Sequence, residues 1–238
     1  MQHVQPEDFA RIYELFQAPI TRFDCGRHCA PLNGGEPFCC STKHAVPVVD
    51  RAEWRLLRGR TRLWRRHHPK DRAGRKMVAE LDKSCLAIEC KGACHCERDN
   101  RSLACRAFPF FPYIDSERQF VGLSIHWTFA DRCWVISNLA IVDAEFRRQF
   151  IAAYELLFKA DPGEFEVHRQ HSASLRRVFS RQHRPIPLID RDGRFFKILP
   201  HRRGMRACPP EGLPKYGPYR SERSYRAALS RAGSSASA

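Results

Sequence analysis

The chain lacks several features that would assign it to a common class of protein. No apolar run approaches the roughly 20 residues needed to cross a bilayer, which predicts no membrane-spanning helix. It contains no CxxC pair, so neither the knuckles of a zinc ribbon nor a thioredoxin-like redox motif is present. No GxGxxG segment, Ser/His/Asp arrangement or paired-carboxylate motif stands out. The sequence therefore offers no candidate catalytic residue and leaves open whether the protein is an enzyme.

The first residues, MQHVQPEDFARIYELF, contain no basic segment followed by an apolar one. They do not resemble a secretory signal, and we expect a cytoplasmic protein. In a reducing compartment, clustered cysteines are more often metal ligands than disulfides. That expectation matters because cysteine is the residue type in which this chain is unusually rich.

Eleven cysteines occur in 238 residues, and nine of them form two blocks rich in proline and glycine. The first block holds Cys25, Cys29, Cys39 and Cys40, and the second holds Cys85, Cys90, Cys94, Cys96 and Cys105. Thiolates suit zinc or an iron–sulfur cluster, and four of them complete either site. The spacing excludes a radical-SAM motif, because Leu32 stands where the third cysteine should be. Nine thiols could serve two sites, or one site with spares.

The two blocks resemble a bacterial cysteine-cluster family described as a zinc- or iron-chelating CxxCxxCC domain. The resemblance rests on Cys25 and Cys29, the Cys39–Cys40 pair, and the ending Arg101-Ser-Leu-Ala-Cys105-Arg106-Ala-Phe108-Pro109. It departs from the family at Ser102, where a proline is usual, and at Arg98, where a tyrosine is usual.

The resemblance implies a cofactor, zinc or an iron–sulfur cluster such as 4Fe–4S, and a set of ligands. Those ligands are Cys25, Cys29, Cys39, Cys40, Cys85, Cys94, Cys96 and Cys105. Cys133 and Cys208 are expected to be ordinary residues. One branch of the family looks like flagellin lysine methylases, so an iron–sulfur-containing protein-modifying enzyme is an alternative to simple metal binding.

Helical and strand periodicities mix without a βαβα order, which predicts an α+β fold. We expect irregular cysteine-rich loops around a metal site, with helices and a small antiparallel sheet. Helices are predicted over 7–16, 51–68, 72–83, 144–160 and 165–182, a strand over 121–130, and a hairpin over 186–199. His126 falls on the polar face of the predicted strand and is expected at the surface or in a position that supports a site, rather than in a catalytic role.

Residues 1–200 are predicted to form one cysteine-cluster metal-binding domain, and 201–238 a basic, disordered tail. The first and second blocks should meet in space, joined by the helices of 50–83.

The net charge of +15 is concentrated in part of the chain. Residues 51–76 hold eleven Lys and Arg against two acids. This predicts an acidic protein partner or a nucleic acid bound through the 51–76 helix and the C-terminal tail, and makes a nucleic-acid-binding module a further alternative. Trp54 and Trp64 fall on the apolar side of the predicted helix, so they are expected in the core.

Overall fold

The computed structural model describes residues 4–199 and 204–236 and has the predicted α+β composition. Its helices are α1 (Pro6–Leu15), α2 (Arg51–Arg60), α3 (Arg72–Ala79), α4 (Leu103–Ala107), α5 (Ala144–Ala160), α6 (Pro162–Arg181) and α7 (Glu222–Ala236). Its strands are β1 (Val48–Asp50), β2 (Trp64–Arg66), β3 (Cys85–Cys90), β4 (Phe110–Ile114), β5 (Phe120–Ile125), β6 (Ile186–Asp190), β7 (Phe195–Leu199) and β8 (Gly204–Ala207).

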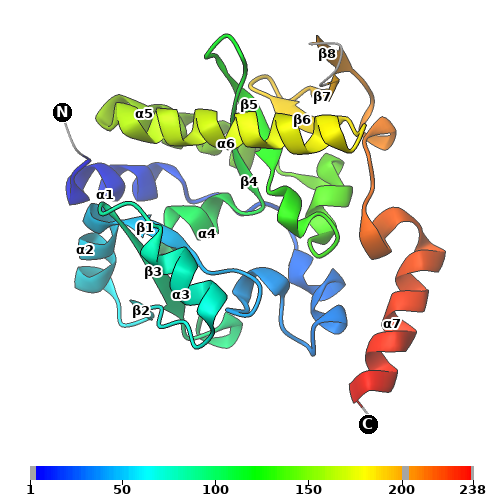
Figure 1. The fold of residues 1–238 in the computed structure, drawn as a ribbon, viewed down its shortest axis with the longest axis horizontal. Coiled ribbons are helices and arrows are strands. Elements are labelled where there is room, and N and C mark those ends of the chain that lie inside the picture. The colour runs from blue at the N-terminus through cyan, green and yellow to red at the C-terminus, as the bar shows by residue number, and fades with distance from the viewer. Residues whose placement is uncertain (1–3, 200–203, 237–238) are drawn as a thin grey trace.

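The strands form two antiparallel sheets that lie in different parts of the molecule. The smaller sheet has the order β1-β3-β2, and the larger has the order β4-β5-β6-β7-β8. In Figure 1 the larger sheet lies behind α5 and α6, the smaller sheet lies with α2 and α3, and α4 runs between the two parts. The first cysteine block follows α1 into the region beside α4, on the side where α7 lies.

The helix starts follow from local chemistry. Asp50 accepts a hydrogen bond from the Ala52 amide at the start of α2, and Asp143 accepts one from the Glu145 amide at the start of α5. The predicted helix 144–160 is confirmed, because its cap and its apolar period agree. Phe146 and Phe150 of this helix pack against Phe16, which follows α1, and join the main core.

Three predictions of secondary structure differ from what is observed; the last is the strand expected over 121–130, which ends at Ile125 and is followed by the 3₁₀ turn Trp127–Phe129. The helix expected over 51–68 ends at Arg60, and Trp64 instead begins β2, where it is paired with Cys90. The Trp64 indole is buried and donates a hydrogen bond to the Asn100 carbonyl at 2.7 Å. Burying the indole with its N–H satisfied favours the strand over further helix.

The second difference is in the C-terminal part, where disorder was predicted. Residues 204–207 form β8 against β7, and Glu222–Ala236 form α7. Between them, Leu213, Tyr216 and Tyr219 are buried. These apolar side chains are spaced too irregularly to give a periodic signal, yet they anchor the segment to the domain. The predicted boundary at 200 falls at residues outside the described ranges.

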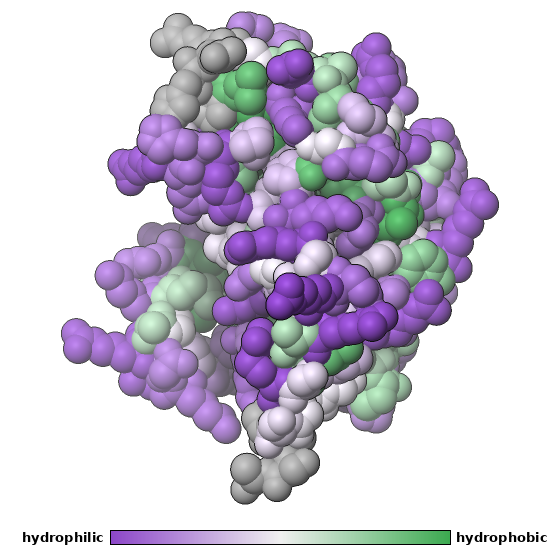
Figure 2. Space-filling model, turned by 90° about the vertical axis from the view of Figure 1, so that its right-hand side faces the viewer, coloured by the Kyte–Doolittle hydropathy of each residue, from purple (hydrophilic) through white to green (hydrophobic). Residues whose placement is uncertain are grey.

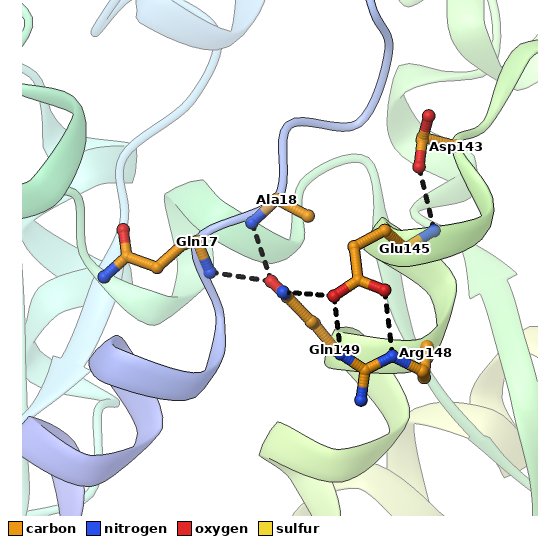
Figure 3. Close-up of polar contacts among 6 residues, drawn as sticks. All are labelled: Gln17, Ala18, Asp143, Glu145, Arg148 and Gln149. Atoms are coloured by element: carbon orange, nitrogen blue, oxygen red, sulfur yellow. Dashed lines mark hydrogen bonds and ion pairs between the residues drawn. The ribbon is translucent and has the colours of Figure 1, made fainter.

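A small polar network fixes the segment that leads from α1 into the first cysteine block (Figure 3). The Gln149 side-chain oxygen accepts hydrogen bonds from the Gln17 and Ala18 amides at 2.8 and 2.7 Å. The Glu145 carboxylate in turn accepts hydrogen bonds from the Gln149 and Arg148 side chains, so α5 holds the Gln149 side chain in place. Helix α5, which packs on the larger sheet, therefore fixes the backbone just before the first cysteine block.

No helix within the described residues is long and apolar enough to pass through a bilayer. The face shown in Figure 2, on the side of α7, is mostly hydrophilic, and its hydrophobic residues are scattered in small areas.

Candidate metal site

The two cysteine blocks meet in space, as the sequence predicted. A Cβ placed on Gly92 in the second block would lie 3.6 Å from Glu36 Oε1 in the first. Gly92 has a φ of 98°, a conformation that glycine adopts readily, and its amide donates to Cys90 Sγ at 3.4 Å. The turn after β3 thus brings the second block beside the first.

Three thiols, Cys40, Cys96 and Cys105, lie within electrostatic reach of Arg101, and Cys90 lies within reach of all three. We call these four thiols the inner thiol group. The Arg101 guanidinium donates a hydrogen bond from Nε to Cys96 Sγ at 3.1 Å. Burial opposes the charge of Arg101, but this hydrogen bond and the charges of Cys96, Cys105 and Cys40 raise its pKa overall. One first-block thiol therefore lies within electrostatic reach of the second-block thiols.

The thiols of the inner group act on one another. Burial raises the pKa of Cys105 to about 12, and the nearby Cys90 and Cys40 add to the effect. Burial also raises the pKa of Cys90, with Cys40 and Cys96 contributing. Crowded thiols resist forming several thiolates together unless a cation lies among them, which is the situation that a metal ion supplies.

The scaffold under the inner group consists of buried hydrogen bonds. Arg106 donates to the carbonyls of Phe16, Asp99 and Arg101, and its guanidinium lies 4.3 Å from the Tyr13 ring centroid. Ser102 caps α4 by accepting from the Cys105 amide at 3.3 Å. Arg106 thus holds the backbone that carries Arg101, and it bonds to carbonyls rather than to a sulfur.

The remaining first-block thiols meet a cysteine that the sequence analysis set aside. The outer thiol group consists of Cys25, Cys29, Cys39 and Cys133. Burial raises the pKa of Cys133, and the charges of Cys25 and Cys29 raise it further. The adjacent Trp134 stacks on His28 with ring centroids 3.9 Å apart, which holds the two segments together. Over 90 residues separate Cys133 from the first block, so spacing carried no signal for it.

The vicinal pair Cys39–Cys40 joins the two groups. Their sulfurs lie 3.9 Å apart, and the hydrogen bond from Cys39 together with the charge of Arg101 lowers the pKa of Cys40 to about 7. Cys39 lies within electrostatic reach of Cys133 and Cys29, whereas Cys40 lies within reach of Arg101. The two adjacent cysteines thus belong to different thiol groups, Cys39 to the outer group and Cys40 to the inner group.

Two predicted ligands lie elsewhere. Cys85 begins β3 opposite Asp50, and burial raises its pKa, with the acids Glu164 and Asp50 contributing. Cys94 is exposed on the short 3₁₀ turn Ala93–His95. Cys90, which the resemblance did not place among the ligands, belongs to the inner group, whereas Cys85 does not.

The thiol groups are not arranged as a finished metal site. Within 4–199 and 204–236, no three or more His, Cys, Asp or Glu side chains form a cluster that could hold a metal ion. The thiols of each group are neighbours, and a metal would have to draw them closer together. Short turns carry most of them, and such segments adjust more readily than helices or sheets.

A second polar site lies beside α4, and little in the sequence indicated it. His126, His168 and His171 line a cavity of about 190 Å³ together with aromatic and small side chains. His168 donates from Nδ1 to the Glu164 carbonyl at 2.8 Å, and His171 Nε2 is buried without a partner in the described structure. Burial lowers the pKa of His126 to about 3 and those of His168 and His171 to about 4.

His126 is half-buried and lines this cavity, where it lies beside the other two histidines rather than on an open surface. Its ring lies 5.4 Å from those of both Phe111 and His171. The spacing of His168 and His171 by three residues on a predicted helix was the one available signal for this cavity.

Comparison with known proteins adds no identification. No protein-family model, curated protein or solved structure matches this chain. What it does must therefore be argued from the residues described above.

Proposed function

We propose that the protein binds a metal, zinc or an iron–sulfur cluster, through its clustered cysteines. The observation that carries this proposal is that Cys40, from the first block, lies within electrostatic reach of Arg101 and of the second-block thiols Cys90 and Cys105, while Cys96 accepts a hydrogen bond from Arg101. Four thiolates are the ligand set of a structural zinc site and of a cubane cluster. Arg101 would act on the bound group through its hydrogen bond to Cys96, since donors to ligating sulfur tune such sites.

The outer thiol group supports a second site of the same kind. Cys25, Cys29, Cys39 and Cys133 bring four more thiols together, and Cys39 adjoins the inner group through Cys40. The free energy of metal binding would then be partly free energy of folding, because the turns that carry these thiols have few other reasons to close. On this proposal the metal orders the region between the two sheets.

The test begins with protein purified without oxygen, its absorption spectrum and its content of zinc, iron and sulfide. Broad visible absorption with iron and sulfide indicates a cluster, and a colourless protein with stoichiometric zinc indicates a zinc site. Cys90→Ser with Cys105→Ser should remove the metal of the inner group. Protein that contains neither zinc nor iron contradicts the proposal.

A matched control uses two cysteines outside both groups. Cys85→Ser with Cys94→Ser makes the same chemical change, and we expect it to leave the metal content unaltered. Metal loss from this variant, with retention in a Cys90→Ser single variant, would mean that Cys85 or Cys94 is a ligand, as in the family-like set, and that Cys90 is not.

A further inference from the structure

An arginine-lined groove lies along α2, and its function is independent of the thiol groups. The groove has a volume of about 680 Å³. Its lining consists of Arg51, Trp54, Arg55, Arg58 and Gly59 from α2, and Arg66 from β2. Four guanidiniums and no carboxylate therefore face the same space. This volume is in the range that encloses a small organic ligand.

The charge in the groove is not neutralised from within. None of its four arginines forms an ion pair with any residue that the structure describes. The nearby acids have other partners: Glu89 pairs with Arg65 and His67, and Glu53 is buried on the other side of α2, where it accepts from Tyr13 and the Leu103 amide. Asp50 caps α2 and interacts with Arg55 through charge alone. The groove therefore carries a positive charge that an anionic ligand would balance.

The spacing of the arginines suits a chain of phosphates. Arg51, Arg55 and Arg58 recur at intervals of four and three residues and lie on one face of α2. At about 1.5 Å per residue, the three positions span about 10 Å of helix axis. Phosphates of one strand rise by about 3.4 Å each along the axis of a duplex and lie further apart in an extended single strand, so this span covers at most about three phosphate intervals. Guanidinium binds phosphate in a bidentate geometry.

The shape of the groove favours a single strand. Its volume accommodates a few nucleotides of one strand and not the width of a duplex. Trp54 lines the groove but is only 7% exposed, so it forms part of the wall and offers no face on which a base could stack. A positively charged groove that follows the backbone is one part of the arrangement by which single-stranded nucleic acid is bound without sequence preference.

We propose that the groove of α2 and β2 binds single-stranded nucleic acid through its phosphates. Arg51, Arg55, Arg58 and Arg66 contact the backbone of the strand. Further basic residues of the segment 51–76 extend the positive surface beyond the groove. An acidic peptide would not share the repeat of the phosphates, and it serves as a competitor in the test.

The experiment measures binding of the full chain to a fluorescent dT12 oligonucleotide by anisotropy between 50 and 300 mM salt. Four phosphate contacts predict a slope of about −2.8 for log K against log[salt], and Arg55→Ala with Arg58→Ala should reduce its magnitude to about 1.4. The same variant should lose at least tenfold in affinity at low salt. A control, Arg223→Ala with Arg231→Ala, removes the same charge from exposed positions on α7, on the opposite side of Figure 1. It should retain the wild-type slope.

A second variant tests the groove without altering charge. A Cβ added at Gly59 meets nothing within 4 Å, so Gly59→Gln fits the fold and places an amide side chain in the groove. We expect it to weaken dT12 binding severalfold. Equal losses in the α7 control, equal affinity for a duplex or for polyglutamate, or unchanged binding by Gly59→Gln would each overturn the proposal.

Discussion

At the scale of single residues, His126 is a half-buried base whose environment favours its neutral form. Burial is the main cause of its lowered pKa, and His171 and His168 contribute by charge repulsion. Its ring lies among aromatic side chains, and none of the neighbouring rings offers a counter-charge. Protonation of His126 in the folded protein is therefore unfavourable, and stability must depend on pH through this residue.

The sign of that dependence follows from the two pKa values. The folded value of about 3 lies below the ordinary value of about 6.5, so the unfolded chain binds the proton more readily. The contribution to stability is complete above about pH 6.5 and is lost as the pH falls toward 3. We expect His126→Phe to reduce the fall in unfolding free energy between pH 7 and pH 5 by about 2 kcal/mol.

Urea denaturation at the two pH values measures this difference. His68→Phe changes an exposed histidine and is the control. Its unfolding free energy should fall between pH 7 and pH 5 by as much as that of the wild type. An equal fall in His126→Phe and wild type would mean that His126 is not held neutral by the fold.

At the scale of elements, α2 shows what a sequence pattern can and cannot predict. Its start was predicted because Asp50 caps it locally. Its end at Arg60 was not, since Trp64 leaves the helix to place its indole against Asn100, 36 residues away. Helix α5 was predicted to the residue because its cap and period are both local. Long-range contacts of this kind are invisible to periodicity.

The same limit applies to the thiols. That clustered cysteines meet could be predicted from their number and from the loops that carry them. Which of them share a group depends on the turn at Gly92 and on the stacking of Trp134 on His28. Cys90 and Cys133 were therefore assigned no role, although each belongs to one of the two groups.

Glu53 links α1, α2 and α4, and its loss should be costly. It is buried and accepts hydrogen bonds from the Tyr13 hydroxyl and the Leu103 amide. Glu53→Ala leaves both donors unpaired, and each costs about 1–3 kcal/mol. We expect a loss of unfolding free energy of roughly 2–5 kcal/mol in urea denaturation. Glu53→Gln, which retains an acceptor oxygen, should lose less.

Glu80→Ala at an exposed position on the end of α3 is the comparison, and it should change stability by less than about 0.5 kcal/mol. A Glu53→Ala variant as stable as this control would mean that the buried carboxylate does not join the three helices.

At the scale of the whole molecule, the C-terminal part closes over the outer thiol group. The Tyr219 hydroxyl donates to the Arg132 carbonyl at 3.0 Å, and the Tyr225 hydroxyl donates to the His28 carbonyl at 2.8 Å. The Tyr216 amide donates to Ser137 at 2.9 Å. Residues near the end of the chain thus bond to the segments that carry Cys29 and Cys133. These hydrogen bonds end at Arg132, His28 and Ser137 and do not reach the inner group.

Weakening the contacts of the C-terminal part should therefore destabilise the turns of the outer thiol group and leave the inner thiol group unchanged. Tyr219→Ala removes a buried ring and its hydrogen bond to Arg132, whereas Tyr219→Phe removes the hydrogen bond alone. By hydrogen exchange, we expect Tyr219→Ala to speed exchange at least tenfold in residues 25–33 and to leave residues 103–114 unchanged, with Tyr219→Phe in between. Faster exchange in both segments would indicate global destabilisation. Unchanged exchange in 25–33 would mean that the C-terminal part does not stabilise the outer group, and that its turns are held by their own contacts.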